Sequence, residues 1–198
     1  MIYILRHGES IVNLQNKLKC KERDGDLTAD GQQESRQAAT WLQDKNIIGI
    51  YTSPFDRTRQ TAEIVGDMLQ IKPMVEDDLH EMNCGELEGR TDRYAWGVWQ
   101  QTYRRWCQGD WDATFPGGES FQEAFERIKR TLAQAAGTGN TVLITHGGIV
   151  KSVVPYLCVN AAAMQRLDPL ANAGIVVLDV YDHGRYVCEA WNITAHLS

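Results

Sequence analysis

Two glycine turns in the sequence each follow a short apolar run, and each carries a histidine. Arg6-His7-Gly8 follows residues 2–5, and His146-Gly147 comes shortly after residues 141–144. Such apolar runs are typical of buried strands, and glycine lets the backbone bend sharply where a strand ends. A histidine at such a turn can act as a nucleophile, and an adjacent arginine can hold an anion. The alternative is an ordinary strand end with solvated polar residues.

A second arginine falls at a corresponding place, because Arg57 lies in the first turn of a helix that follows the strand expected at 47–51. In an open α/β sheet, ligands bind outside the carboxyl ends of the strands. We therefore expect one cluster of four side chains there: Arg6, His7, Arg57 and His146. Two guanidinium groups offer forked donors to a tetrahedral dianion. The helix start at Gly147 adds backbone N–H groups that suit a phosphate.

Phosphoryl transfer is the chemistry that needs this set of groups. A neutral imidazole of His7 can attack phosphorus in line and form a phosphohistidine. Its ordinary pKa of about 6.5 leaves it largely neutral in the cytosol, and neighbouring cations favour the neutral form further. An acid must protonate the departing alkoxide, and its conjugate base must then activate water.

These residues belong to six ordered blocks that resemble the histidine phosphatase superfamily, the phosphoglycerate mutase-like family. A closing segment at 192–197 resembles the phosphoserine and α-ribazole phosphatase-like members. The blocks are Arg6-His7-Gly8-Glu9-Ser10 with Asn13; Leu27-Thr28 with Gly31 and Gln33; Ser53-Pro54-Phe55-Asp56-Arg57 with Gln60-Thr61-Ala62; Leu79-His80-Glu81 with Gly85, Glu88 and Gly89; Pro116-Gly117-Gly118-Glu119-Ser120; and Thr145-His146-Gly147-Gly148.

The resemblance implies roles for individual residues. His7 is the nucleophile that becomes phosphorylated, and Glu81 is the proton donor. The phosphoryl group is bound by Arg6, Asn13, Arg57 and His146. For Asn13 the alternative is local, because an asparagine in a first helical turn often satisfies nearby backbone groups. The resemblance also implies that no metal or organic cofactor is needed.

The segment after the acid separates two branches of the family. Mutases usually continue as Glu-Arg-His-Tyr-Gly, whereas this chain has Glu81-Met82-Asn83-Cys84-Gly85. Methionine and cysteine cannot make the charge-assisted contacts that hold a substrate carboxylate. The sequence therefore predicts a phosphomonoesterase acting on a small phosphorylated metabolite. The alternatives are a phosphoglycerate mutase-type isomerase and a non-catalytic module that binds a phosphorylated ligand.

The elements that must position these groups alternate between strands and helices. Strands are expected at 2–5, 47–51, around 74–75, and at 141–144, 175–180 and 186–191. Helices are expected from a cap at Thr28, from a cap at Ser53 with Pro54 in the first turn, over 94–111, from a capping box at Ser120, and over 148–157. This pattern predicts a single three-layer α/β/α domain over 1–198 with a mostly parallel sheet. A tryptophan-rich helical insertion at about 90–115 is expected to cap the site.

Two groups of residues allow more than one interpretation. Lys19, Lys21 and Arg23 either meet a second anionic group of the substrate or face solvent. An aromatic set at helical spacing is more often core, although part of it can wall the substrate cavity. This set is Trp96, Trp99, Tyr103 and Trp106.

Composition narrows the classes of partner. The 198 residues carry a net charge of −6, which argues against nucleic acid as a partner. No apolar run is long enough to cross a membrane. Five cysteines without a Cys-x-x-Cys pair favour reduced thiols over a disulfide frame or zinc site. We expect a cytoplasmic protein, for which a homodimer through the strand at 175–180 is possible.

Overall fold

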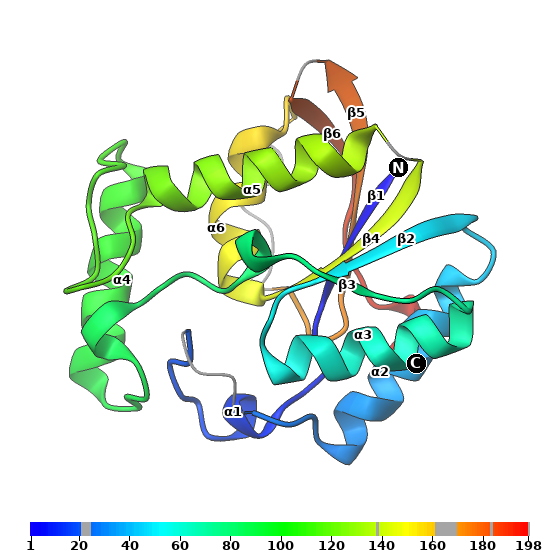
Figure 1. The fold of residues 1–198 in the computed structure, drawn as a ribbon. Helices are drawn as coiled ribbons and strands as arrows, with labels where there is room; N and C mark the ends of the chain where they lie inside the picture. The colour runs from blue at the N-terminus through cyan, green and yellow to red at the C-terminus, as the bar shows by residue number, and fades with distance from the viewer. Residues whose placement is uncertain (21–24, 138, 161–169, 183, 198) are drawn as a thin grey trace.

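A six-stranded sheet forms the centre of the computed structural model, which describes residues 1–20, 25–137, 139–160, 170–182 and 184–197 (Figure 1). The strand order is β3-β2-β4-β1-β5-β6. Neighbours among β1 to β4 pair in parallel, whereas β5 is antiparallel to both β1 and β6. The strands are β1 Ile2–Arg6, β2 Ile47–Thr52, β3 Met74–Val75, β4 Asn140–Thr145, β5 Ile175–Asp182 and β6 Arg185–Ile193. The predicted mostly parallel sheet is confirmed.

Alternating side chains of β1 show that helices cover both faces of the sheet. Ile2 and Ile4 pack in one core with residues of α5 and α6, while Tyr3 and Leu5 pack in another with residues of α2 and α3. Figure 1 shows the two helix layers on either side of the strands. The helices are α1 Ile11–Leu14, α2 Ala29–Leu42, α3 Asp56–Leu69, α4 Arg93–Cys107, α5 Phe121–Ala136 and α6 Gly147–Leu157. The short 3₁₀ turns are η1 Asp77–Leu79, η2 Gly85–Leu87 and η3 Ala195–Leu197.

Helix capping follows the sequence at two places and departs from it at a third. Thr28 Oγ1 accepts the N–H of Gly31 over 3.0 Å, and Ser120 begins α5 with a capping box. The prediction that Ser53 caps the next helix is wrong, because Phe55 is the N-cap of α3. The hydroxyl of Ser53 instead lies 2.8 Å from a ring nitrogen of His146. The short helix α1 was not predicted.

Two glycines let the turn after β1 press against the start of α2. A Cβ on Gly8 would overlap the carbonyl oxygen of Gly31, and a Cβ on Gly31 would overlap that of Glu9. Any side chain at either position would push the two segments apart. This close approach fixes the segment that carries His7.

Strand β5 is paired within the chain on both sides over part of its length, which limits how a dimer could form. Residues 175–178 pair with β1 on one side, and β6 pairs along the other side. Residues 175–178 therefore offer no free strand edge to a second subunit, and the homodimer itself stays a prediction. Within the part of the chain that the structure describes, no helix is both long and apolar enough to span a membrane.

Candidate active site

Strand register brings the two histidines together. Arg6 is aligned with Thr145 in the parallel pair of β1 and β4, and the His7 N–H donates to the carbonyl of Thr145 over 3.0 Å. The next residues in both strands therefore leave the sheet side by side. The ring centroids of His7 and His146 are 5.3 Å apart, with their planes at 64°.

A cavity of about 270 Å³ opens at this edge of the sheet. Six of the seven residues assigned to the site from the sequence line it: Arg6, His7, Asn13, Arg57, Glu81 and Gly147. The seventh, His146, is fully enclosed and packs against His7 and Phe55. The structure thus gathers the whole set, with one histidine at the cavity and the other behind it.

The ring of His7 is oriented by a backbone carbonyl. Its Nδ1 lies 2.7 Å from the carbonyl oxygen of Gly8, which can only accept, so we assign the proton to Nδ1. The lone pair on Nε2 then accepts from Nε of Arg57 over 3.2 Å. Burial, followed by the charges of Arg57 and Arg6, lowers the pKa of His7 well below its ordinary value. His7 is therefore a neutral imidazole with Nε2 available to an electrophile that displaces Arg57.

The two arginines are held by backbone carbonyls. Arg6 donates from NH1 to Leu170 over 2.6 Å, and Arg57 donates from NH2 to Lys19 over 3.0 Å. Among the described residues, the buried Nε of Arg6 has no hydrogen-bond partner. Gly147 leaves room for this guanidinium, because a Cβ there would lie 3.0 Å from the same Nε. Burial lowers the pKa of Arg6, and the charge of Glu81 opposes that shift.

His146 is the N-cap residue of α6, and its ring is fixed from the neighbouring strand. Its Nε2 lies 2.8 Å from Oγ of Ser53, which follows β2. Within the described residues its buried Nδ1 has no hydrogen-bond partner. Burial, followed by the charge of Arg57, lowers the pKa of His146 well below its ordinary value.

Asn13 makes local hydrogen bonds and also lies at the cavity, so both roles suggested by the sequence fit its position. Its Oδ1 accepts from the backbone N–H and the hydroxyl of Ser10 over 3.0 and 2.9 Å, which is the local role. The same side chain lines the cavity beside His7. The local hydrogen bonds therefore hold the asparagine in place at the cavity wall.

The side chain of Glu81 contacts the first turn of α6. Its carboxylate accepts the N–H groups of Gly148 over 2.8 Å and Ile149 over 2.6 Å, and also that of Met82 over 2.8 Å. A negative charge is favoured at this end of a helix. The N–H groups that the sequence suggested for a phosphate are thus partly taken by the acid. A Cβ on Gly148 would come within 2.8 Å of the same carboxylate oxygens.

An ion pair that the sequence analysis missed braces the loop carrying Glu81. The buried Arg127 forms a two-point contact with Glu119 over 2.8 and 3.1 Å, and its NH1 donates to the carbonyls of Asp78 and His80 over 2.6 and 2.8 Å. Glu119 also accepts the backbone N–H of Asn83 over 2.6 Å. The available signal was a charged Arg127 on the apolar face of α5.

The residues left open by the sequence divide between core and cavity. Trp96 and Trp99 line the cavity, whereas Trp106 is buried and donates from its indole to the carbonyl of Ala113 over 2.7 Å. Lys19 pairs with Glu88 over 3.5 Å. Lys21 and Arg23 lie outside the described residues.

Two comparisons of the sequence with known proteins match most of the chain. A family model described as histidine phosphatase superfamily, branch 1, matches residues 2–194. The probable phosphoglycerate mutase GpmB of Escherichia fergusonii is 29% identical over 193 residues, which cover 96% of this chain and 89% of that protein.

Solved structures of phosphatases share the fold. The alpha-ribazole phosphatase from Shigella flexneri aligns with a TM-score of 0.77 at 23% identity, over 97% of this chain and 96% of that one. The mycobacterial glucosyl-3-phosphoglycerate phosphatase aligns with a TM-score of 0.81 at 22% identity, over 98% of both chains. At such identities the likeness supports the fold and leaves the substrate open.

Proposed function

The chain belongs to branch 1 of the histidine phosphatase superfamily, and from that membership we propose that it is a phosphomonoesterase acting on a small phosphorylated metabolite. The reaction passes through a phosphohistidine on His7 and requires no metal ion for turnover. The observation that carries the proposal is the state of His7: a buried, neutral imidazole whose Nε2 lone pair meets Arg57 at the cavity.

In the first half of the reaction, Nε2 of His7 attacks phosphorus while the bond to the ester oxygen breaks. Arg6 and Arg57 draw the equatorial oxygens toward His7, and Asn13, His146 and the turn at Gly147 complete the phosphate site. Within the described part of the chain the buried Nε of Arg6 has no partner, which supports this role because an anion would satisfy it. In this step Glu81 is the acid that gives a proton to the departing alkoxide.

In the second half, water attacks the phosphohistidine. The carboxylate of Glu81 takes a proton from that water, the bond between phosphorus and Nε2 breaks, and inorganic phosphate leaves with His7 neutral again. The three N–H groups around the Glu81 carboxylate hold it ready for this role as a base. Arg127 and Glu119 act as positioning residues, because they fix the loop on both sides of Glu81.

The leaving group is expected to occupy the part of the cavity under α4, which acts as the cap of a single domain. Trp96 and Trp99 supply an apolar wall there, and Lys151 lies on the rim. An adjoining cavity of about 240 Å³ shares Trp99 and Lys151 and is also lined by Arg104. This wall and these cations suit a leaving group that carries its own carboxylate or second phosphate.

A mutase remains the second candidate, because curated relatives such as GpmB are named as probable phosphoglycerate mutases. The residues after Glu81 favour hydrolysis over this alternative. Met82 and Cys84 are buried in the core, away from solvent, and neither replaces the arginine or tyrosine that mutases have in this region.

Two further assignments belong to the proposal. We place the protein in the cytoplasm, which its five free cysteine thiols support, because reduced thiols persist there. If the chain forms a homodimer, the contact uses a surface other than the edges of β5 at residues 175–178, since these are already paired.

Steady-state assays test the proposal. The wild type should hydrolyse p-nitrophenyl phosphate in the presence of a chelator, and His7→Ala should not. A panel of phosphorylated metabolites should include 3-phosphoglycerate with and without a bisphosphate primer. Isomerisation with little hydrolysis would favour the mutase, and no turnover of any phosphate ester would contradict both enzymes.

A further inference from the structure

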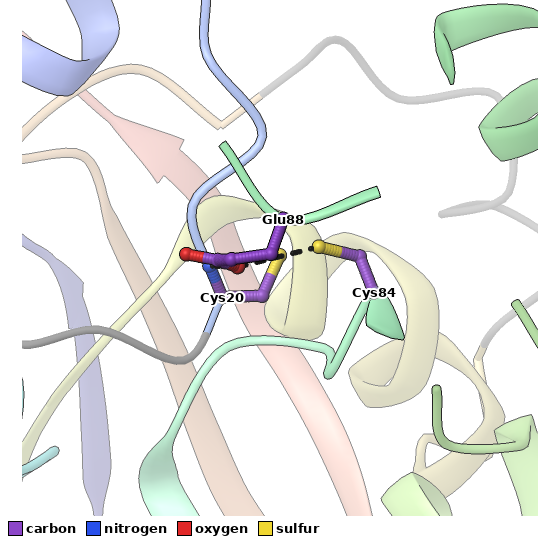
Figure 2. A group of neighbouring side chains, drawn as sticks. All are labelled: Cys20, Cys84 and Glu88. Atoms are coloured by element: carbon purple, nitrogen blue, oxygen red, sulfur yellow. Dashed lines mark hydrogen bonds between the residues drawn. The ribbon is translucent and has the colours of Figure 1, made fainter. Parts of the chain in front are cut away.

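Cys20, which lines the cavity, meets Cys84 and Glu88 (Figure 2). Both thiol sulfurs and an oxygen of Glu88 all lie within 4.8 Å of one another. Cys20 and Cys84 are buried, and the Glu88 side chain is 15% exposed. We propose that Cys20, Cys84 and Glu88 form a binding site for a thiophilic divalent cation such as Zn²⁺. This site is separate from the phosphatase chemistry and does not depend on it.

The distance between Cys84 and Glu88 matches the ligand spacing around a tetrahedral zinc ion. With Zn–S of about 2.3 Å and Zn–O of about 2.0 Å, tetrahedral angles separate a sulfur and an oxygen by about 3.5 Å and two sulfurs by about 3.8 Å. Sγ of Cys84 lies 3.6 Å from Oε2 of Glu88, and the two sulfurs lie within 4.8 Å of each other. The three groups therefore need only small side-chain movements to coordinate a cation.

The surroundings of the cluster favour a bound cation. The N–H of Cys20 donates to Oε2 of Glu88 over 2.6 Å and orients the carboxylate. Lys19 Nζ lies 3.5 Å from Oε1 of the same carboxylate. Two thiolates and one carboxylate carry three negative charges, which one divalent cation and the lysine ammonium would balance. Buried charges are tolerated when they are paired in this way.

A route to the cluster and an open ligand position are both present. Cys20 lines the substrate cavity, so a cation can reach the sulfurs from solvent through it. Three protein ligands leave a fourth position for water, as in zinc sites that keep an open position. The ligands come from two separate segments, and for that reason the sequence shows no Cys-x-x-Cys signal.

Binding must also balance protons. The Cys20 thiol is buried, and burial in the absence of a cation disfavours the charged thiolate. The Cys84 thiol donates to Oε2 of Glu88 over 3.6 Å and therefore carries its proton as well. Coordination therefore converts two S–H groups into thiolates and releases two protons for each cation bound.

The test is a titration of the reduced, chelator-treated protein with Co²⁺ and with Zn²⁺. We expect one Co²⁺ per chain with a thiolate-to-metal charge-transfer band, one Zn²⁺ per chain by competition with a chromophoric chelator, and two protons released per Zn²⁺. Cys20→Ser, Cys84→Ser and Glu88→Gln should each weaken Zn²⁺ binding by more than about 100-fold, since losing even an outer partner of a metal site typically costs about 10- to 100-fold.

Control variants come from the chain itself. Cys158 and Cys188 are a second neighbouring pair of thiols, and Cys107 is exposed. Serine at any of these three positions should leave Zn²⁺ affinity unchanged. Circular dichroism confirms folding, and Glu88→Gln preserves side-chain size if a cysteine variant fails to fold.

Several results would overturn the site. These are the absence of the charge-transfer band, the release of fewer than two protons per Zn²⁺, and Zn²⁺ binding by Glu88→Gln as tight as that of the wild type. Equal loss of binding in the Cys158 and Cys188 variants would also contradict it. None of these measurements needs turnover, so they separate failure of the site from failure of the proposed phosphatase activity.

Discussion

Arg57 donates from Nε to Nε2 of His7 over 3.2 Å, and thereby contacts the atom that the proposed mechanism uses as nucleophile. In the free protein this contact favours the neutral imidazole. A phosphate dianion that accepts the N–H groups of Arg57 breaks this hydrogen bond. The lone pair on Nε2 of His7 is then free to attack the phosphorus of the bound substrate. Substrate binding and exposure of the nucleophile are thus one event in this account.

The paired N–H groups of the Arg57 guanidinium should contribute to kcat in addition to its positive charge. Arg57→Lys keeps the positive charge but loses the paired N–H groups, so kcat is expected to fall about 10²- to 10³-fold, as for loss of one transition-state donor. Steady-state kinetics with an aryl phosphate measures this. Arg59→Lys changes an exposed residue of the same helix and should leave kcat within about twofold, given how little such surface positions contribute. Similar losses in both variants would argue against a specific role for Arg57.

Glu81 should affect substrates according to their leaving groups. Glu81→Gln removes the proton that an alkoxide needs, so alkyl phosphates should slow by about 10²- to 10⁴-fold. An activated aryl phosphate leaves without that proton, so its phosphoryl transfer to His7 should slow much less. Single-turnover rates for both substrates give the comparison. Equal rate losses for the alkyl and the aryl phosphate would show that Glu81 is not the acid.

The ion pair of Arg127 and Glu119 should contribute strongly to stability. The two side chains are 6% and 10% exposed, so Arg127→Met leaves a buried carboxylate without its partner and is expected to cost about 3–5 kcal/mol. Arg130→Met, on the same helix, removes an ion pair with Asp78 whose side chains are 59% and 34% exposed. That control should cost less than about 1 kcal/mol. Urea unfolding measures both, and equal costs would contradict the bracing role.

Stability should fall in mild acid because two histidines are buried as neutral rings. Burial lowers the pKa of both His7 and His146 below their unfolded values, so the folded state binds fewer protons. Stability is then complete above about pH 6.5 and is lost as the pH falls below it, by about 1.4 kcal/mol per pH unit for each ring.

Urea unfolding of the wild type and of a variant with asparagine at both positions tests this dependence. The free energy of unfolding should change less between about pH 7 and pH 5.5 in the variant, which lacks both titrating rings. An identical pH dependence in the two proteins would show that other groups control the acid transition.

Much of the fold follows from local signals in the sequence. Apolar runs give the strands, and the caps at Thr28 and Ser120 give two helix starts, because both depend on neighbouring residues only. Ser53 looked like a cap on the same grounds. Its hydroxyl instead binds His146, a partner 93 positions away that no local pattern could supply.

The candidate site shows the same division. Six of the residues that line the cavity could be named from ordered motifs, whereas the contacts that orient them depend on the packed structure. The carboxylate of Glu81 meets the start of α6 from a loop that Arg127 and Glu119 contact on both sides. The approach of Cys20 to Cys84 likewise arises from two segments that are distant in the sequence.

The most direct measurement is a search for the phosphoryl group on His7. Glu81→Gln mixed with an activated aryl phosphate should accumulate the intermediate, because the acid is not needed to form it and the base that removes it is absent. Alkaline quenching followed by mass spectrometry of the peptide containing His7 should find one phosphoryl group per chain, and none when His7 is also changed to asparagine. Product release without any phosphoryl group on His7, or with the group on another residue, would contradict the account.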